Sequence, residues 1–359
     1  MKYIIQDKQY HFFSAFDTNT GIYVRTGVFD RDGKDTGVDP FQASFPHLID
    51  VGIMGQCIHG RTGLCENAGI ACYQNGPYMK SPNMTVDDFR WIAEQCKGRT
   101  YQFALGGRGD PDQHERFEDI LRICCENKIV PNFTTSGYGM TKEIAMLCKK
   151  YCGAVAVSWY RAPYTMNAIQ LLIDAGVKTN IHFVLSKTSM DEAIERLQHE
   201  DFPKGINAVV FLLYKPVGLG KSESVITVNE EKLEAFYRAL TQANLFRVGI
   251  DSCNVPGYLN FGYQILETSF DACEGARYSC YIGPDLLMTP CSFDQKAQYA
   301  VQLRPKTLEE VWNGETFETF RQKMRAACLS CNKRELCLGG CPLLPEIVLC
   351  PRRERSIRE

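Results

Sequence analysis

The sequence lacks the features that mark membrane, secreted and nucleic-acid-binding proteins. No apolar run approaches the roughly 20 residues that span a bilayer, and the N-terminal segment MKYIIQDKQYHFF turns polar after Ile5, so it has no signal-peptide core. The formal net charge is only −2 over 359 residues, which offers no basic surface to a nucleic acid or a membrane. We therefore expect a cytoplasmic protein with neither of these partners.

The chain is instead rich in cysteine, with 17 in all. Disulfides are rare in a reducing compartment, so many cysteines there indicate metal binding. Five cysteines from Cys96 to Cys152 lie in amphipathic helical sequence, where a cysteine is commonly a small buried hydrophobe. The others fall in glycine-rich or irregular sequence, where ligand or redox chemistry is the stronger expectation.

Apolar runs alternate with amphipathic segments from residue 48 onward, which predicts βαβ units around a parallel sheet. No GxGxxG follows the first run, which argues against a dinucleotide-binding fold. The predicted strands are 48–54, 101–105, 131–136, 154–160, 180–186 and 208–214, and the predicted helices are 87–96, 114–126, 142–152, 167–176 and 191–198. Six such units favour an α/β fold, a partial (β/α)6 barrel with its chemistry at the C-terminal ends of the strands.

Three regions follow from this pattern. Residues 1–47 predict an N-terminal β-hairpin extension, 48–254 the barrel, and 255–359 a C-terminal cluster-binding domain in which the alternation stops. Within the last region, 307–324 is predicted to form one helix.

The strongest signal is the block Cys328-x2-Cys331-x5-Cys337-x3-Cys341, which Cys350 follows. Closely spaced thiolates let one loop wrap a soft or borderline metal, and four of them can also form a closed zinc site. Three further cysteines lie upstream, so that eight thiolates are available for two four-ligand centres: Cys273, Cys280, Cys291, Cys328, Cys331, Cys337, Cys341 and Cys350.

This pattern resembles the SPASM domain that follows many radical S-adenosylmethionine (SAM) barrels. The resemblance extends to PCSF (290–293) and to the TLEEVWN stretch, although Leu286 stands where the family usually has glycine. It implies a first auxiliary [4Fe–4S] cluster, in which Cys280 is the ligand the family most readily spares, and a second one. The implied ligands are Cys273, Cys280, Cys291 and Cys341 for the first cluster and Cys328, Cys331, Cys337 and Cys350 for the second.

The first strand of the barrel is followed by Cys57-x7-Cys65-x6-Cys72 in a glycine-rich loop. Radical SAM enzymes hold three irons of a [4Fe–4S] cluster in such a loop and leave the fourth iron to SAM. Their usual spacing is Cx3Cx2C, and this loop is longer at both gaps, while Cys72-Tyr73 resembles the family's Cys-aromatic ending. The alternative is three buried or zinc-binding cysteines, and His59 is interpreted as a polar loop residue rather than a ligand.

The second strand ends in Gly106 and Gly107, which resemble the start of the family's GGEP motif for the SAM amino group. Arg108 replaces the glutamate of that motif, and Asp110 is the candidate for the displaced acid. Thr135, Ser136 and Ser158 lie at strand ends where the family contacts methionine or ribose. A plain glycine-rich turn and ordinary turn hydroxyls are the alternatives.

Cys253 follows the short strand RVGID near the expected active face. Its thiol is the candidate catalytic group, as a donor of a hydrogen atom to a substrate radical. Packing in a loop or core is the competing interpretation.

The resemblance implies an enzyme that uses SAM and three [4Fe–4S] clusters to make a 5′-deoxyadenosyl radical. The expected substrate is a ribosomally made peptide, with a crosslink or other modification as product, an electron donor such as flavodoxin or ferredoxin, and a separate leader-binding protein as a further partner. Sulfatase-type protein maturation is the alternative, disfavoured because Ser292 stands where that subgroup has aspartate. A non-enzymatic zinc or iron–sulfur protein and an electron-transfer module remain rivals from other classes.

Overall fold

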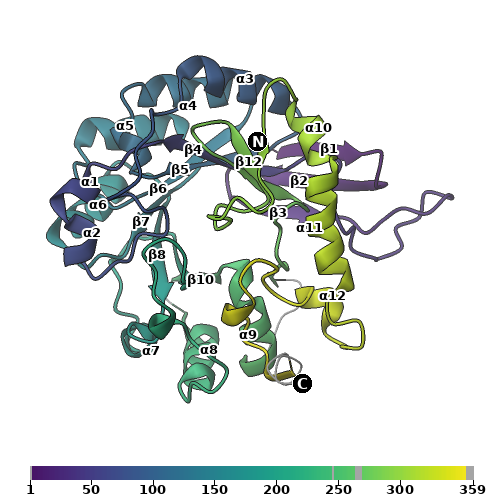
Figure 1. Ribbon diagram of the computed structural model, residues 1–359. Helices are drawn as coiled ribbons and strands as arrows, with labels where there is room; N and C mark the ends of the chain where they lie inside the picture. The colour runs from purple at the N-terminus through teal and green to yellow at the C-terminus, as the bar shows by residue number, and fades with distance from the viewer. Residues whose placement is uncertain (1, 245, 263–268, 353–359) are drawn as a thin grey trace.

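A single twisted sheet of ten strands organises the molecule (Figure 1). The computed structural model describes residues 2–244, 246–262 and 269–352. The strand order is β10-β9-β8-β7-β6-β5-β4-β11-β12-β13, in which each neighbouring pair from β4 to β10 runs parallel. This arrangement confirms the predicted α/β fold with a largely parallel partial barrel.

The ends of strands β4 to β9 lie within two residues of the ends of the six predicted apolar runs. β4, for example, covers LIDVGIM and buries five of its seven residues, as expected for a strand that is covered on both faces. A seventh parallel strand, β10, lies beyond the six predicted units. The bounds are β4 (Leu48–Met54), β5 (Gln102–Gly107), β6 (Val130–Thr135), β7 (Val155–Ser158), β8 (Thr179–Leu185), β9 (Ala208–Leu213) and β10 (Arg247–Ile250).

Helices α3 to α8 cover the outside of the curved sheet (Figure 1). Cys96, Cys124 and Cys148 are fully buried there, while Cys125 is exposed. Helix α4 begins three residues later than predicted because the ring of His114 accepts a hydrogen bond from the Arg116 amide. The bounds are α1 (His59–Thr62), α2 (Leu64–Asn67), α3 (Val86–Cys96), α4 (Phe117–Glu126), α5 (Lys142–Tyr151), α6 (Pro163–Asp174), α7 (Met190–Gln198), α8 (Leu233–Gln242) and α9 (Val255–Phe261).

The C-terminal region continues the same sheet. β11 (Ser279–Ile282) pairs in parallel with β4, and β12 (Leu287–Thr289) and β13 (Val301–Gln302) follow antiparallel. The cysteine-rich region and the barrel therefore share one sheet, which the sequence pattern did not indicate.

The single helix predicted over 307–324 is wrong, because the segment forms two helices. These are α10 (Leu308–Trp312), which begins at a Thr307/Glu310 capping box, and α11 (Glu315–Ala326). Asn313 is the C-cap of the first helix, and Gly314 is the N-cap of the second. A short α12 (Arg334–Cys337) follows within the cysteine block, and no helix of the described residues is long and apolar enough to cross a bilayer.

The N-terminal extension is a three-stranded antiparallel sheet of β1 (Lys2–Asp7), β2 (Phe12–Asp17) and β3 (Tyr23–Arg25). Tyr101, immediately before β5, anchors it through its hydroxyl, which donates to Ser14 O at 2.8 Å and accepts from Ile5 N at 3.1 Å. The extension therefore lies at the N-terminal ends of the barrel strands, away from the edge that carries the cysteine loop.

Replacing Tyr101 by phenylalanine should lower the free energy of unfolding by about 2 kcal/mol, because the Ser14 carbonyl and the Ile5 amide lose their buried partner. Urea unfolding followed by circular dichroism measures the change. Tyr78→Phe is the control, since Tyr78 is 77 % exposed. Equal unfolding midpoints for the two variants would show that this hydroxyl does not anchor the extension.

Candidate metal and cofactor sites

The loop after β4 brings its three cysteines together. Gly76 N donates to Cys72 Sγ at 3.3 Å, and a Cβ built on Gly76 would lie 3.0 Å from Cys57 Cβ. Cys65 Sγ lies 3.8 Å from the Tyr160 hydroxyl, beyond the end of β7. Burial raises the pKa of Cys65 to about 11, with smaller contributions from Cys57 and Cys72. Thiolate ligation here therefore requires that a bound cation displace protons.

The segment after β9 closes over this loop. Leu219 N donates to Cys72 O at 2.9 Å, and Gly218 lies against the same backbone. Gly218 has φ 62°, and a Cβ there would lie 2.4 Å from Tyr73 O and 2.6 Å from Cys72 O. Only glycine allows both the left-handed conformation and this close approach.

Unpaired polar atoms gather around the same loop. Among the described residues, four buried side-chain atoms have no hydrogen-bond partner: His59 Nδ1, Gln74 Nε2, Arg108 Nε and Asp112 Oδ1. All four belong to the cysteine loop or the loop after β5. Buried polar groups are normally satisfied, so a concentrated set of unsatisfied ones fits a site that a polar cofactor completes.

The predicted SAM-contacting residues of the next loops lie nearby, but several are already engaged. Asp110 Oδ1 accepts from Ser136 N at 3.0 Å, and Oδ2 lies 2.9 Å from His59 Nε2 and accepts from Ser136 Oγ. Thr135 Oγ1 accepts from Gly137 N at 3.0 Å. Asp110, in the loop after β5, therefore connects the loop after β4 through His59 with the loop after β6 through Ser136. Both oxygens of its carboxylate have a partner.

The remaining predicted residues differ in what they present. A Cβ on Gly106 would meet nothing within 4 Å, so this strand end is open, whereas Gly107 packs against the Met54 backbone. Ser158 ends β7 and is partly exposed. Burial raises the pKa of Asp112 to about 6, and the neighbouring Asp110 adds to the rise.

Tyr73 connects the loop to the C-terminal region. Its ring packs against the Phe293 ring, with the centroids 4.8 Å apart and the planes tilted by 40°. Lys215 Nζ lies 4.7 Å from the centroid of the Phe293 ring. Lys215 is 8 % exposed and forms an ion pair with Asp251. Neither charge was among the predicted site residues, although Lys215 and Asp251 follow the C-terminal ends of β9 and β10, where a charged residue indicates a site.

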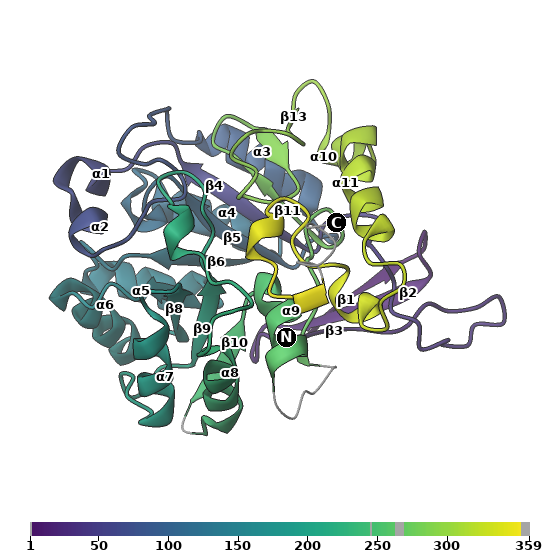
Figure 2. The same ribbon diagram turned by 60° about the horizontal axis from the view of Figure 1, so that its bottom comes forward.

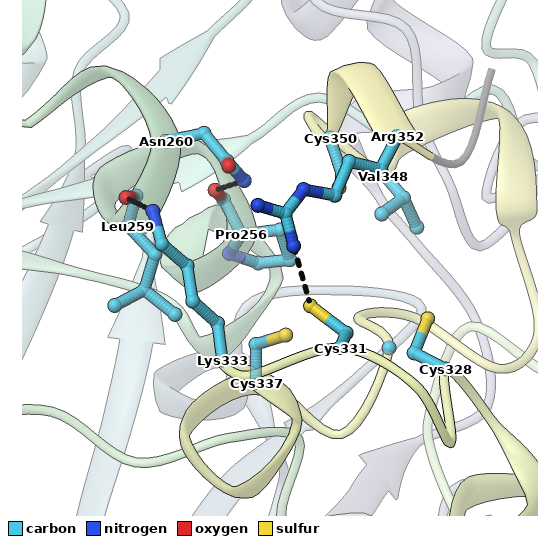
Figure 3. A pocket seen from close by; sticks show the side chains of 11 residues that line it. Pro256, Leu259, Asn260, Cys328, Cys331, Lys333, Cys337, Val348, Cys350 and Arg352 are labelled. Atoms are coloured by element: carbon cyan, nitrogen blue, oxygen red, sulfur yellow. Dashed lines mark hydrogen bonds between the residues drawn. The ribbon is translucent and has the colours of Figure 1, made fainter. Parts of the chain in front are cut away.

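In the C-terminal region, four cysteines line one pocket (Figure 3). Three of them belong to the block before Cys341, and the fourth comes from the segment after it; Cys328, Cys331, Cys337 and Cys350 are the four. Arg352 Nη1 lies 3.6 Å from Cys331 Sγ and 3.3 Å from Asn332 Oδ1. The pocket thus gathers four soft ligands with a cation against one of them.

No three His, Cys, Asp or Glu side chains in residues 2–244, 246–262 and 269–352 converge on a single-ion site.

The sequence profile of the SPASM domain, an iron–sulfur cluster-binding domain, matches residues 273–332. No curated protein sequence matches the chain. Among solved structures, SuiB of Streptococcus suis bound to S-adenosylmethionine is similar at 18 % identity with a TM-score of 0.62, over 84 % of this chain and 74 % of that one.

SuiB bound to its precursor peptide SuiA is similar at 14 % identity with a TM-score of 0.68, over 98 % of this chain and 100 % of that one. anSMEcpe with bound AdoMet and a Kp18Cys peptide gives 15 % identity and a TM-score of 0.59, over 82 % and 89 % of the chains. The chain has the fold of the radical SAM enzymes with a SPASM domain.

In this SPASM domain, Leu286 keeps the left-handed conformation, with φ 61°, at the position where glycine is usual. Three cysteines of the C-terminal region, Cys273, Cys291 and Cys341, interact electrostatically with Cys253.

The assignment of Cys280 to the first auxiliary cluster stays a prediction, although this residue is buried away from the other cysteines of that set. Cys280 is 2 % exposed and faces α3, where Cys96 is its nearest electrostatic neighbour among cysteines. The assignment of Cys253 as a hydrogen donor also stays a prediction. Its interaction with Cys341, followed by burial, raises the pKa of this thiol well above the usual range.

Replacing Gly218 by alanine should reduce the iron content of anaerobically reconstituted protein by about four per chain, because the new Cβ would displace the Cys72–Tyr73 backbone. Iron and sulfide analysis measures this. Gly21→Ala is the matched control, since Gly21 also has a left-handed φ of 77° but no atom within 4 Å of an added Cβ. Full iron in the Gly218 variant would show that the closing segment does not shape the cysteine loop.

Replacing Arg352 by glutamine should lower the reduction potential of one cluster by about 60 mV, since a hydrogen bond to a charged sulfur contributes about 1.4 kcal/mol. The guanidinium stabilises the more negative, reduced state, so its removal favours oxidation. Electron paramagnetic resonance (EPR) redox titration measures the potential. Arg116→Gln, on the exposed side of α4, should leave it unchanged, and an equal shift in both variants would contradict the assignment.

Proposed function

We propose that this protein is a radical SAM enzyme that modifies a ribosomally made peptide. The observation that carries the proposal is the convergence of Cys57, Cys65 and Cys72 at the strand-end edge of a parallel barrel, among buried polar atoms without partners. Three thiolates suit a [4Fe–4S] cluster with one open iron, and the open iron suits the amino and carboxylate groups of SAM.

When bound, the reduced cluster supplies the electron that splits SAM into methionine and a 5′-deoxyadenosyl radical, which removes a hydrogen atom from the substrate. The chain's own residues orient the cofactor and exclude water. Gly106 leaves the second strand end open, and the nitrogen atoms His59 Nδ1 and Arg108 Nε offer polar contacts. Thr135, Ser136 and Ser158 complete the proposed binding surface, with Asp110 as the group that aligns Ser136 and His59.

The SPASM domain is proposed to hold two auxiliary [4Fe–4S] clusters, for a total of three per chain. Cys328, Cys331, Cys337 and Cys350 around one pocket support the second of these. The first would lie beside the Tyr73–Phe293 stack and could exchange electrons with the substrate site. Flavodoxin or ferredoxin is the proposed external donor, in the cytoplasm.

The proposal of a peptide substrate is supported by the fold that the chain shares with SuiB and anSMEcpe, both solved with peptides. A crosslink or related modification is favoured over sulfatase-type oxidation because Ser292 replaces the aspartate of that subgroup. The N-terminal sheet lies at the opposite end of the barrel from the cysteine loop. A separate leader-binding protein is therefore the simpler way to deliver a leader near the active face.

The test is SAM cleavage by the reduced, reconstituted protein. Wild type should release 5′-deoxyadenosine, and the variant with Cys57, Cys65 and Cys72 all changed to alanine should fall to background, because no cluster remains to deliver the electron. Cys125→Ala is the control, since Cys125 is exposed on α4 and outside every group described. Cleavage by the triple variant at the wild-type rate would refute the proposal.

A further inference from the structure

The geometry of β11 argues against Cys280 as a ligand of the first auxiliary cluster. Without Cys280, that cluster needs a different fourth ligand. In β11, Cys280 pairs with Ile49, and its neighbour Tyr281 pairs with Asp50. Successive side chains of a strand point to opposite faces. A Cβ on Gly52 would meet the Tyr281 hydroxyl, so Tyr281 occupies the inner face of the barrel and Cys280 the outer one.

Cys253 lies beyond the C-terminal end of β10, in a short turn. It belongs to the 3₁₀ helix Ser252–Asn254 that follows β10. Asp251 N donates to Phe211 O at 3.1 Å, and Asn254 Nδ2 donates to the same oxygen at 3.1 Å. Asp251 and Asn254, which flank Cys253 in the chain, are thus both hydrogen-bonded to β9, and this restrains the turn that carries the thiol.

The other three cysteines converge on this turn. A Cβ on Gly340 would lie 3.0 Å from Pro256 Cγ, so the loop carrying Cys341 packs against the start of α9, next to Cys253. Figure 2 shows α9 beside the yellow C-terminal segment, as Figure 1 does.

Cys273 and Cys291 form the second half of the group. A Cβ on Gly275 would lie 2.9 Å from Pro290 O and 3.7 Å from Cys273 Sγ, which brings the turn after Cys273 against the residue before Cys291. The thiols of both are electrostatic neighbours of Cys253, and Cys280 is a neighbour of none of the three. Lys215 Nζ, beside Cys253 and Cys291, supplies a positive charge next to the group.

We infer that Cys253, not Cys280, completes the first auxiliary cluster together with Cys273, Cys291 and Cys341. The cluster is then closed, with a protein thiolate on every iron, so a substrate cannot bind to it directly. The role of this cluster in the reaction is then electron transfer. The inference rests on the proposed function for the presence of the cluster, and on this chain's own geometry for the ligand.

The experiment uses the full chain with Cys57, Cys65 and Cys72 changed to alanine, which leaves only the auxiliary clusters, about eight irons. Cys253→Ala and Cys280→Ala are added separately, as the same chemical change at two buried cysteines. Iron and sulfide content is measured, and EPR spectra of the reduced protein are recorded with and without cyanide.

Cys253→Ala should lose about four irons, or keep them with an altered spectrum that shifts with cyanide, because one iron has become open. Cys253→Ser should keep the iron and change the spectrum, since a serine oxygen can take the ligand position. Cys280→Ala should match the background protein in iron content and in the EPR spectrum. Cys280→Val, which avoids a cavity at this buried position, should match it as well.

An unchanged, cyanide-insensitive spectrum with full iron in Cys253→Ala would overturn the inference. Loss of about four irons in both Cys280 variants would overturn it as well. These results leave the proposed function standing, because the background protein still holds its auxiliary clusters. A background protein without iron or sulfide would instead contradict the proposed function itself.

Discussion

The pairing of β11 with β4 is the constraint on which both candidate sites depend. It joins the first strand of the SPASM domain to the first strand of the barrel, in the same direction, over Ser279 to Ile282. Arg321 stabilises the junction because its guanidinium, 1 % exposed on α11, donates to Ala276 O and to Trp312 O. With the two regions in one sheet, Phe293 reaches Tyr73 and the C-terminal cysteines reach the turn after β10.

The partly buried rings of Tyr73 and Phe293 pack together where the cysteine loop meets the C-terminal region. Tyr73 directly follows Cys72, and Phe293 comes two residues after Cys291. The contact between the two rings therefore brings the segment of Cys72 close to the segment of Cys291. Lys215 packs on the far side of Phe293 and is neutralised by Asp251, which also accepts from Leu213 N at 3.2 Å. A buried charge needs such a partner. This ion pair therefore holds Lys215 against Phe293 and helps to position the neighbouring turn that contains Cys253.

The sequence could predict the features that repeat or that act locally. Apolar runs such as LIDVGIM predicted the strands, and cysteine spacing indicated which loops are candidates for metal binding. The choice between Cys253 and Cys280 could not be predicted, because it depends on which face of β11 each residue occupies, and β11 was recognised only through its pairing with β4. Likewise, the carboxylate of Asp110 looked available in the sequence, whereas contacts with Ser136 and His59 from other loops engage it.

The ligand choice also bears on how a substrate radical would end. A thiolate bound to iron carries no S–H hydrogen, so Cys253 cannot be both a cluster ligand and a hydrogen donor. The cysteines from Cys96 to Cys152 belong to the helical layer and its edges, and Cys280 faces that layer. No cysteine of the described residues is then left on the inner face to return a hydrogen atom. Under the proposed function, transfer of an electron to the closed auxiliary cluster is the favoured end of the reaction, because forming a new bond within a peptide after loss of a hydrogen atom also requires the loss of one electron.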